Sequence, residues 1–261
     1  MTAATPAPYD ALAPVYDLLT ASHGHDRWLL ALERLALDHG LCGRRLLDVG
    51  CGTGSSFLPL LRAGYRVTAC DLSAAMARRA RSRARGRATV HVADARRLPR
   101  WGRFDLITFL DDGLNHLTDP AEVVSALRGV RANLDARGLL VLDVNTLAAY
   151  RTAPDLVAAD DDRFVVWRGR LATLPAPGGL ADVVVEVFER LPGDDVWRRR
   201  CHRHAHRHYP LAQLRALVAE AGLRVVASRG QRPGAVLDEH VDEDVHPKAV
   251  FLLAVDERRT P

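Results

Sequence analysis

The chain has 261 residues and a mass of 28.7 kDa, which suits one α/β domain with an insertion or two small domains. Apolar residues make up 48% and charged residues 26%, which allows a full core and excludes a disordered chain. The net charge is +4, from 36 basic and 32 acidic residues, and Lys248 is the only lysine. Because such an arginine excess is typical of codon bias, the charge alone does not predict an acidic or nucleic-acid partner.

The cysteines and the apolar segments exclude several other classes. The four cysteines form no CxxC pair, which speaks against a disulfide scaffold or a structural zinc site. The segment Met1–Asp10 lacks the basic start and apolar core of a secretion signal. The apolar run Ala249–Val255 is too short to span a bilayer. We therefore expect a soluble, cytoplasmic protein with no membrane partner.

The first 150 residues alternate between helical and strand patterns. Strands separated by helices at this spacing predict a parallel sheet with helices on both faces. Ser73 is a plausible N-cap. The expected elements are, in chain order, a helix at 26–39, a strand at 45–49, a helix at 55–63, a strand at 65–70, a helix after Ser73, strands at 89–92 and 104–110, a helix at 119–134 and a strand at 138–145.

The pattern changes after Tyr150, where strand-like runs are joined by short turns rich in proline and glycine. Consecutive strands with short connections are antiparallel. The expected strands lie at 164–174, 180–189 and 196–209; a helix at 210–221 and strands at 223–228 and 249–255 follow. We therefore divide the chain into N-terminal helices and a core at 1–150, an antiparallel β insertion at 151–209 that forms a lid, a substrate wall or a dimer surface, and a closing part of the core at 210–261.

A glycine-rich turn is the most specific motif of the chain. It reads Leu-Leu-Asp-Val-Gly-Cys-Gly-Thr-Gly at 46–54, where an expected strand meets a helix and bare backbone can approach a ligand closely. A dinucleotide-binding fingerprint would place its third glycine at position 55, which is Ser55, and no GK[ST] of a phosphate loop follows. The loop therefore suits a nucleoside that carries an amino-acid tail better than a diphosphate.

Three carboxylates lie at or near the ends of neighbouring expected strands. Asp71 ends the second strand and can accept hydrogen bonds from both ribose hydroxyls. Asp94, with Ala95, follows the third strand and can accept from an adenine amino group. Asp48 lies in the first strand, where it either anchors the loop or faces a ligand amine through water. Together with the loop they predict one ligand site at the carboxyl edge of the sheet.

These motifs resemble those of the class I S-adenosylmethionine-dependent methyltransferases, over about 9–145 and again in the closing strands. The resemblance implies a Rossmann-like, seven-stranded sheet whose last strand is antiparallel, and S-adenosyl-L-methionine as the cofactor. It places the glycines beside the methionine part, Asp71 at the ribose, and Asp94 and Ala95 at the adenine. The residues expected to bind the cofactor are Tyr16, Asp48, Gly50, Gly52, Gly54, Asp71, Leu72, Asp94, Ala95 and Leu110.

The segment Leu110–Leu117 follows the fourth strand, which in this family faces the transferred methyl group. It lacks the DPPY/NPPY and Pro-Cys signatures of nucleic-acid base methylation, and its layout is similar to that of aminosugar N,N-dimethyltransferases. That similarity makes His116 a candidate general base, because an imidazole titrates near neutral pH; the alternative is a helix cap or packing role. The residues expected to contact the substrate are Asp111, Asp112, Asn115 and Asn145.

Two further patches have more than one interpretation. Four histidines between 202 and 208 alternate along an expected strand, so their side chains share one face of it. That face has three possible interpretations: a metal site, a solvated surface or the wall of a cleft. We expect no metal, because no local carboxylate or thiol completes the set. Six arginines between 78 and 87 could contact RNA phosphates, but no aromatic residues lie between them, so a solvated helix face is the preferred interpretation.

We therefore predict a methyltransferase that acts on a nitrogen or oxygen of a small-molecule substrate, in specialised metabolism. The alternative is an RNA or protein methyltransferase that uses the arginine-rich helix. A nicotinamide-dependent oxidoreductase would need the other glycine spacing. A non-catalytic cofactor-binding or interaction domain would be suggested by loss of the carboxylate at Asp71, which is present. The β insertion makes a homodimer plausible.

Overall fold

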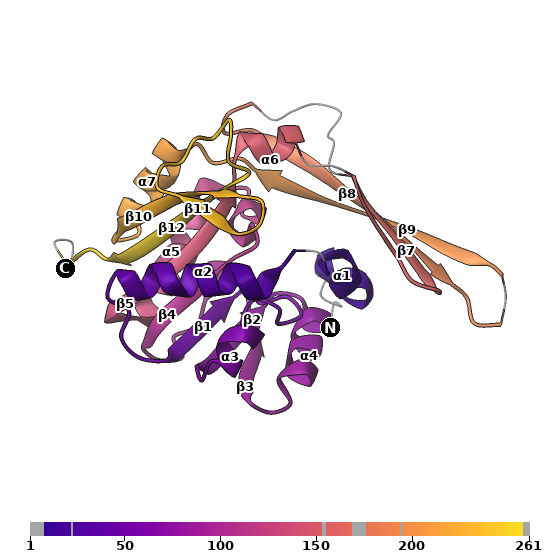
Figure 1. Ribbon diagram of the computed structural model, residues 1–261, viewed down its shortest axis with the longest axis horizontal. Coiled ribbons are helices and arrows are strands. Elements are labelled where there is room, and N and C mark those ends of the chain that lie inside the picture. Colours follow the sequence, from indigo (N-terminus) through magenta and orange to yellow (C-terminus); the bar gives the residue numbers. More distant parts are fainter. Residues whose placement is uncertain (1–7, 22, 153–154, 169–175, 194, 258–261) are drawn as a thin grey trace.

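The computed structural model describes residues 8–21, 23–152, 155–168, 176–193 and 195–257. A central sheet of eight strands has the order β11-β10-β12-β5-β4-β1-β2-β3 (Figure 1). Strands β1 to β5 are parallel to one another, and β12 is antiparallel to both β5 and β10. The strands are β1 (Arg45–Val49), β2 (Arg66–Asp71), β3 (Ala88–Val92), β4 (Phe104–Phe109), β5 (Leu134–Asn145), β10 (Leu223–Arg232), β11 (Val236–Asp238) and β12 (Lys248–Val255).

Helices cover both faces of this sheet. One face packs against α2 (His25–Asp38), α3 (Leu58–Arg62) and α4 (Ala74–Ala84), and the other against α5 (Pro120–Asn133) and α7 (Leu211–Glu220). The two apolar layers follow from the strand sequences, because successive side chains of a buried parallel strand point to opposite faces. Leu46 belongs to the first layer and its neighbour Leu47 to the second. No helix among the described residues is long and apolar enough to cross a membrane.

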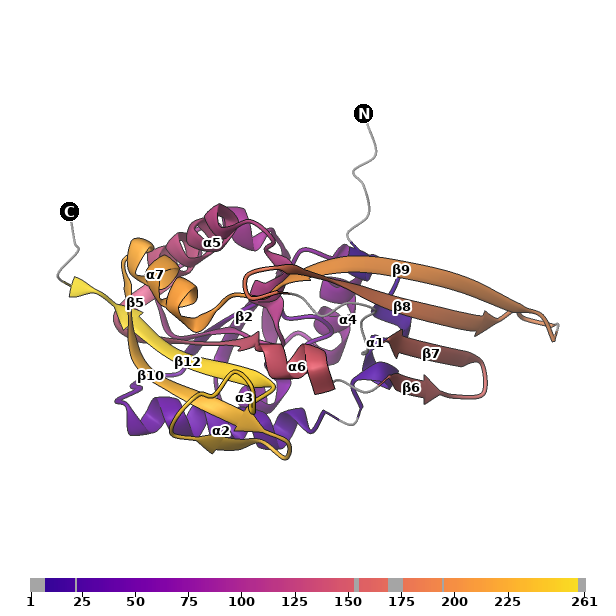
Figure 2. The same ribbon diagram turned by 90° about the horizontal axis from the view of Figure 1, so that it is seen from above.

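A second, antiparallel sheet of four strands projects from the core as an arm (Figures 1 and 2). Its order is β6-β7-β8-β9, and valines on β7 and β8 pack against the helix α1 in a small core of their own. The sheet therefore lies beside the N-terminal segment as well as the main domain. The remaining elements are η1 (Pro8–Asp10), α1 (Ala13–Leu19), η2 (Ala95–Arg97), η3 (Gly113–His116), α6 (Leu147–Thr152), β6 (Leu156–Ala159), β7 (Arg163–Arg168), β8 (Leu180–Arg190) and β9 (Trp197–Arg207).

The predicted fold class is confirmed: a Rossmann-like sheet with helices on both faces, an antiparallel final strand and an antiparallel β insertion. The main sheet has eight strands instead of seven, because the short β11 folds back onto β10. The arm contains β6, which was not expected. The expected strand at 164–174 is β7 up to Arg168, and 169–174 lie outside the described residues.

Candidate active site

The glycine loop between β1 and α3 adopts a backbone that only glycine takes easily. Gly50, Gly52 and Gly54 have φ values of 69°, 53° and 95°, in the left-handed region. A Cβ on Gly54 would lie 3.0 Å from the ring of Phe57 and 3.5 Å from the backbone of α4 at Ala80. Gly54 thus permits close packing of loop and helix, whereas Gly50 and Gly52 line a cavity of about 500 Å³.

Asp48 supports this loop from below. Its side chain is fully buried, and its two carboxylate oxygens accept hydrogen bonds from the hydroxyls of Ser56 and Thr108. Burial raises the pKa of Asp48 to about 7. Of the two roles open for this residue, the structure shows the anchor. Asp48 is fully buried and lines neither this cavity nor the larger one that adjoins it, so its expected contact with the cofactor stays a prediction without a supporting geometry.

Asp71 holds the loop from the side and faces the same cavity. Its carboxylate accepts hydrogen bonds from the backbone N–H of Gly52, at 2.8 Å, and of Ser73, at 2.7 Å. Ser73 in turn caps α4, as expected, by accepting from Met76 N–H. Burial raises the pKa of Asp71 to about 6. Leu72, next in the chain, is half exposed and lines the cavity.

The far wall of the cavity comes from the ends of β3 and β4. Asp94, Ala95 and Leu110 all line it. Asp94 caps η2 by accepting from the N–H of Arg96 and also pairs with the Arg96 guanidinium, which lowers the pKa of Asp94. An adenine amino group at this position would share the carboxylate with Arg96.

The N-terminal segment closes the cavity from above. Tyr9 and Tyr16 line it, with ring centroids 6.0 Å apart. Two carboxylates attach this segment to the core: Asp10 accepts from the N–H of Ala75 at the start of α4, and Asp17 accepts from the hydroxyl of Thr53 in the glycine loop. The tyrosines are therefore held over the glycine loop.

A sharp turn after β4 is fixed by buried charges. Asp111 and Asp112 both have left-handed φ values, 55° and 52°, which aspartate tolerates better than most residues. The fully buried Asp143 on β5 accepts from both of their backbone N–H groups, at 2.7 and 3.2 Å. The ammonium of Lys248 on β12 bonds Asp143 at 2.8 Å and Asp111 at 3.2 Å. It also lies 5.0 Å from the ring centroid of Trp28.

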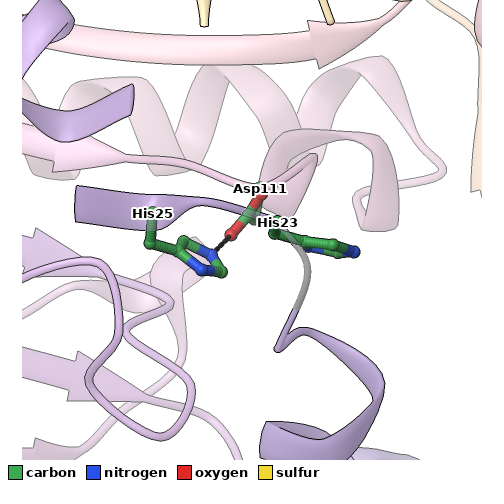
Figure 3. A group of neighbouring side chains, drawn as sticks. All are labelled: His23, His25 and Asp111. Atoms are coloured by element: carbon green, nitrogen blue, oxygen red, sulfur yellow. Dashed lines mark hydrogen bonds and ion pairs between the residues drawn. The ribbon is translucent and has the colours of Figure 1, made fainter. Parts of the chain in front are cut away.

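The two acidic residues of this turn have different partners. Figure 3 shows the Asp111 carboxylate directed at the His25 ring, and the Nε2–Oδ2 distance is 2.7 Å. Lys248 and His25 lower the pKa of Asp111 and keep its carboxylate charged. Asp112 instead accepts from the Asn145 amide at 3.0 Å and lies 3.4 Å from His206 Nδ1. Its enclosed position raises the pKa of Asp112 to about 7.

His116 belongs to a cluster of neutral imidazoles. Its Nε2 lies 3.0 Å from the Tyr9 hydroxyl, and its ring centroid is 4.2 Å from that of His206 and 5.5 Å from that of His204. Burial lowers the pKa of His116 to about 3 and that of His204 to about 4. His116 was a candidate base because an imidazole ordinarily titrates near neutral pH, and in the structure its pKa is lowered from that range. Of the three interpretations of the histidine tract, a cleft wall describes His204 and His206.

A second cavity of about 1110 Å³ adjoins the first. Asp112, Asn145, His206 and Lys248 line this larger cavity, whereas His116 lines the smaller one. The residues that line both cavities, and so mark their junction, are Tyr9, Tyr16, His25, Ser55 and Asp111.

Asn115 does not reach either cavity. It is fully buried, its amide donates to the backbone of Arg207 on β9, and its oxygen accepts from the N–H of Asn145. The expected substrate contact is therefore wrong for Asn115, because its polar atoms hold η3, β5 and β9 together. Asn145, by contrast, lines the larger cavity.

The comparisons with known proteins agree with this geometry. Residues 46–138, from the glycine loop to the start of β5, match the family model of a methyltransferase domain. These residues form the methyltransferase domain of the chain. The methyltransferase is 29% identical, over 84% of its length and 90% of the relative, to a protein of Geobacillus sp. (strain WCH70) that is named as a methyltransferase.

Two further similarities extend this comparison. The methyltransferase is 32% identical, over 54% of its length and 56% of the relative, to the dTDP-3-amino-3,6-dideoxy-α-D-glucopyranose N,N-dimethyltransferase of Streptomyces fradiae. Its fold is similar to the crystal structure of an S-adenosylmethionine-dependent methyltransferase from Clostridium acetobutylicum, with a TM-score of 0.77, 20% identity, and coverage of 95% of this chain and 98% of that one.

The smaller cavity fits S-adenosyl-L-methionine. Its volume lies in the range of about 300–1,000 Å³ common for cofactor pockets. The left-handed backbone at Gly50 and Gly52 leaves room for an amino-acid tail, and the Asp71 carboxylate can accept from ribose hydroxyls. Leu72, Met76 and Leu110 supply an apolar lining for a base.

Among the residues that the structure describes, two groups of side chains bring metal-ligating atoms within 4.8 Å of one another: His23, His25 and Asp111 (Figure 3), and Asp112, His116 and His206. In the first, the ammonium of Lys248 already pairs with Asp111 and would repel a cation. In the second, His116 Nε2 is already hydrogen-bonded to Tyr9. We treat neither group as a metal site, and the expectation that the reaction uses no metal stays a prediction.

Three of the four arginines of α4 have partners within the chain. Arg83 contacts Asp17 and the oxygens of Thr53, Arg79 donates to Pro14 O, and Arg81 donates to Val90 O. These three side chains therefore attach α1, the glycine loop and β3 to the helix. Part of the charge that the sequence assigned to a solvated helix face is therefore used in contacts within the chain.

Proposed function

We propose that this methyltransferase transfers the methyl group of S-adenosyl-L-methionine to an amino nitrogen of a small molecule bound in the larger cavity. The observation that carries the proposal is the carboxylate of Asp112, which lines the larger cavity next to the junction of the two cavities and is hydrogen-bonded by Asn145 and not by Lys248. A cavity wall with carboxylates attracts an ammonium group. The aminosugar substrate named for the Streptomyces fradiae relative also carries an amine.

In this proposal the residues of the smaller cavity bind and orient the cofactor. Asp71 accepts from the ribose hydroxyls, Asp94 and Ala95 contact the adenine, and Leu72 and Leu110 pack on the base. Gly50 and Gly52 leave room for the methionine tail, and Tyr16 closes over it. When bound, the cofactor would supply an electrophilic methyl group on a sulfonium, which a positioned nucleophile can accept in a dry pocket while the neutral thioether leaves.

Nitrogen is favoured over oxygen by the electrostatics of the site. An amine needs only to lose its ammonium proton before it attacks, and a group with a pKa near neutrality can accept that proton. An unactivated hydroxyl is a much weaker acid and would need a stronger base. The Nε2 atom of His116 is already hydrogen-bonded to the Tyr9 hydroxyl, and burial lowers the pKa of His116 to about 3, so we propose that His116 orients Tyr9 and does not accept the proton.

The test is methyl transfer from radiolabelled S-adenosyl-L-methionine, followed by mass spectrometry of the products. The panel contains dTDP-3-amino-3,6-dideoxy-α-D-glucopyranose, a peptide with a free N-terminal glycine, a catechol and an RNA oligonucleotide. We expect one or two methyl groups on an amine nitrogen. Labelling of the catechol alone would assign an O-methyltransferase, and salt-sensitive labelling of RNA alone would support the arginine-rich helix; either result would refute the proposal.

A further inference from the structure

The position of Asp112 is fixed by groups other than its own carboxylate. Asp143 holds the backbone N–H of Asp111 and of Asp112, and Lys248 holds Asp143. The turn therefore keeps its shape whatever the Asp112 side chain binds. That side chain lines the larger cavity, and 21% of its surface is exposed there.

The carboxylate of Asp112 is held at one oxygen and open at the other. Asn145 donates to Oδ2, and His206 Nδ1 lies 3.4 Å from the same atom. No described residue donates a hydrogen bond to Oδ1. Asp111, by contrast, is occupied by Lys248 and His25. Asp112 is therefore the carboxylate of the turn that can take part in proton transfer without breaking an ion pair with lysine.

His206 lies behind Asp112 and limits its movement. Its side chain is 2% exposed, and the edge-on ring of His116 packs against it. Burial, together with His116 and His204, lowers the pKa of His206 well below its ordinary value. The imidazole therefore stays neutral, and it can donate a hydrogen bond to Asp112 without drawing a proton from it.

We infer that Asp112 accepts the proton of the substrate ammonium, which deepens the proposed function and depends on it. One N–H bond of R–NH₃⁺ breaks and one O–H bond forms on the Asp112 carboxylate, which gives R–NH₂ and a carboxylic acid. The nitrogen lone pair is then free for attack. The carboxylic acid later returns its proton to solvent through the larger cavity.

The charges around Asp112 set the pH range of this step. Asp111 and Asp143 face Asp112 and raise its pKa, and Lys248 faces it and lowers its pKa. The neutral groups around it are His116, His206, Tyr9, Tyr16 and Tyr150. Burial raises the pKa of Asp112 to about 7, which matches the optimum for a base that works near neutral pH. The ionised, proton-accepting form predominates above that pH.

The experiment compares methyl transfer by wild type and by Asp112→Asn. The first probe is the amine that wild type methylates, either the dTDP-amino sugar or the peptide with an N-terminal glycine. The second probe is the analogue in which an aminooxy group replaces that amine. The aminooxy group is neutral at pH 7, so it needs no base. We expect Asp112→Asn to lower kcat for the amine about 10²-fold, which is in the range of general base catalysis. The rate should recover as the pH approaches the pKa of the amine, and the aminooxy analogue should react at nearly the wild-type rate.

Calorimetry of amine binding with S-adenosylhomocysteine present gives a second readout, in two buffers of different ionisation enthalpy. When the amine binds at pH 7, wild type should release a fraction of a proton to the buffer, whereas Asp112→Asn should release no proton. Asp112→Glu keeps a carboxylate and should retain the wild-type pH dependence. Asp38→Asn, at the exposed end of α2, is the matched control and should change nothing.

Three outcomes would overturn the inference. If Asp112→Asn keeps the wild-type rate and pH profile, Asp112 is not the proton acceptor. If the amine and the aminooxy analogue lose rate equally, its role is structural. If wild type methylates neither amine, the proposed function fails and this inference fails with it.

Discussion

Lys248 is predicted to be the residue on which the candidate site depends most for stability. It bonds the fully buried Asp143 at 2.8 Å and Asp111 at 3.2 Å, and its own side chain is 21% exposed. Replacing it by methionine keeps the apolar stem and leaves two carboxylates without their cation. Removal of one partner from a buried ion pair costs about 3–5 kcal/mol. Because part of the network reaches solvent, we expect the lower end, about 3 kcal/mol.

The assay is equilibrium unfolding in urea at pH 7, followed by circular dichroism. The matched control is Arg128→Met, which breaks the exposed pair with Glu220 and should change the midpoint little. Lys248→Arg keeps the charge and should lose less stability than Lys248→Met. A loss below about 1 kcal/mol in Lys248→Met would show that the network is no stronger than a surface pair and would refute the reasoning.

The pH dependence of this variant has a definite sign. Lys248 and His25 lower the pKa of Asp111, so this pairing stabilises the fold above the unfolded-state pKa of about 3.9. That stabilisation is lost as the pH falls through the lower folded-state pKa. The difference between wild type and Lys248→Met should therefore be largest at neutral pH and shrink in acid. A difference that grows toward low pH would contradict this assignment.

Three further predictions concern the cofactor and the substrate. Asp71→Asn should weaken binding of S-adenosylhomocysteine, measured by calorimetry, by about 10- to 100-fold, because hydrogen bonds to a charged group contribute roughly 1.5–3 kcal/mol; an unchanged affinity would remove the ribose from this position. Asp94→Asn should weaken binding less, because Arg96 already engages that carboxylate. His116→Ala should lower kcat and leave cofactor affinity unchanged, with partial recovery in His116→Gln; equal turnover in all three forms would leave His116 a packing role only.

The parts of the molecule that the sequence predicted have local signals. A strand, a glycine turn and a helix succeed one another within 46–62. The N-cap Ser73 lies three residues before Met76, from whose N–H it accepts a hydrogen bond. Asp71 was expected at the ribose because its place at a strand end follows from the strand itself. Alternation in the β9 histidines predicted one shared face, but which face is covered depends on η1 and η3, which are far away in the chain.

The residues that sequence reasoning missed are joined only by the fold. Lys248 and Asp111 are 137 residues apart, and His25 and Asp111 are 86 apart. No spacing rule connects such positions, and Asp143 lies in a strand whose apolar run explains its burial but not its partners. One signal was available: a chain with 35 arginines uses lysine once, at the start of β12. A compact ammonium fits between Asp111 and Asp143, where the larger fork of an arginine would need more room.

The turn at Asp111 and Asp112 shows why two adjacent, identical residues can differ in role. In the sequence they are an acidic pair that either binds an ammonium or orients an imidazole, and nothing local separates them. The left-handed turn directs one carboxylate toward Lys248 and His25 and the other toward Asn145 and the larger cavity. Opposite pKa shifts follow from these surroundings: the charged neighbours hold Asp111 ionised, and enclosure without a lysine bond raises the pKa of Asp112. The geometry of the turn, and not the residue type, therefore separates a structural anion from a candidate base.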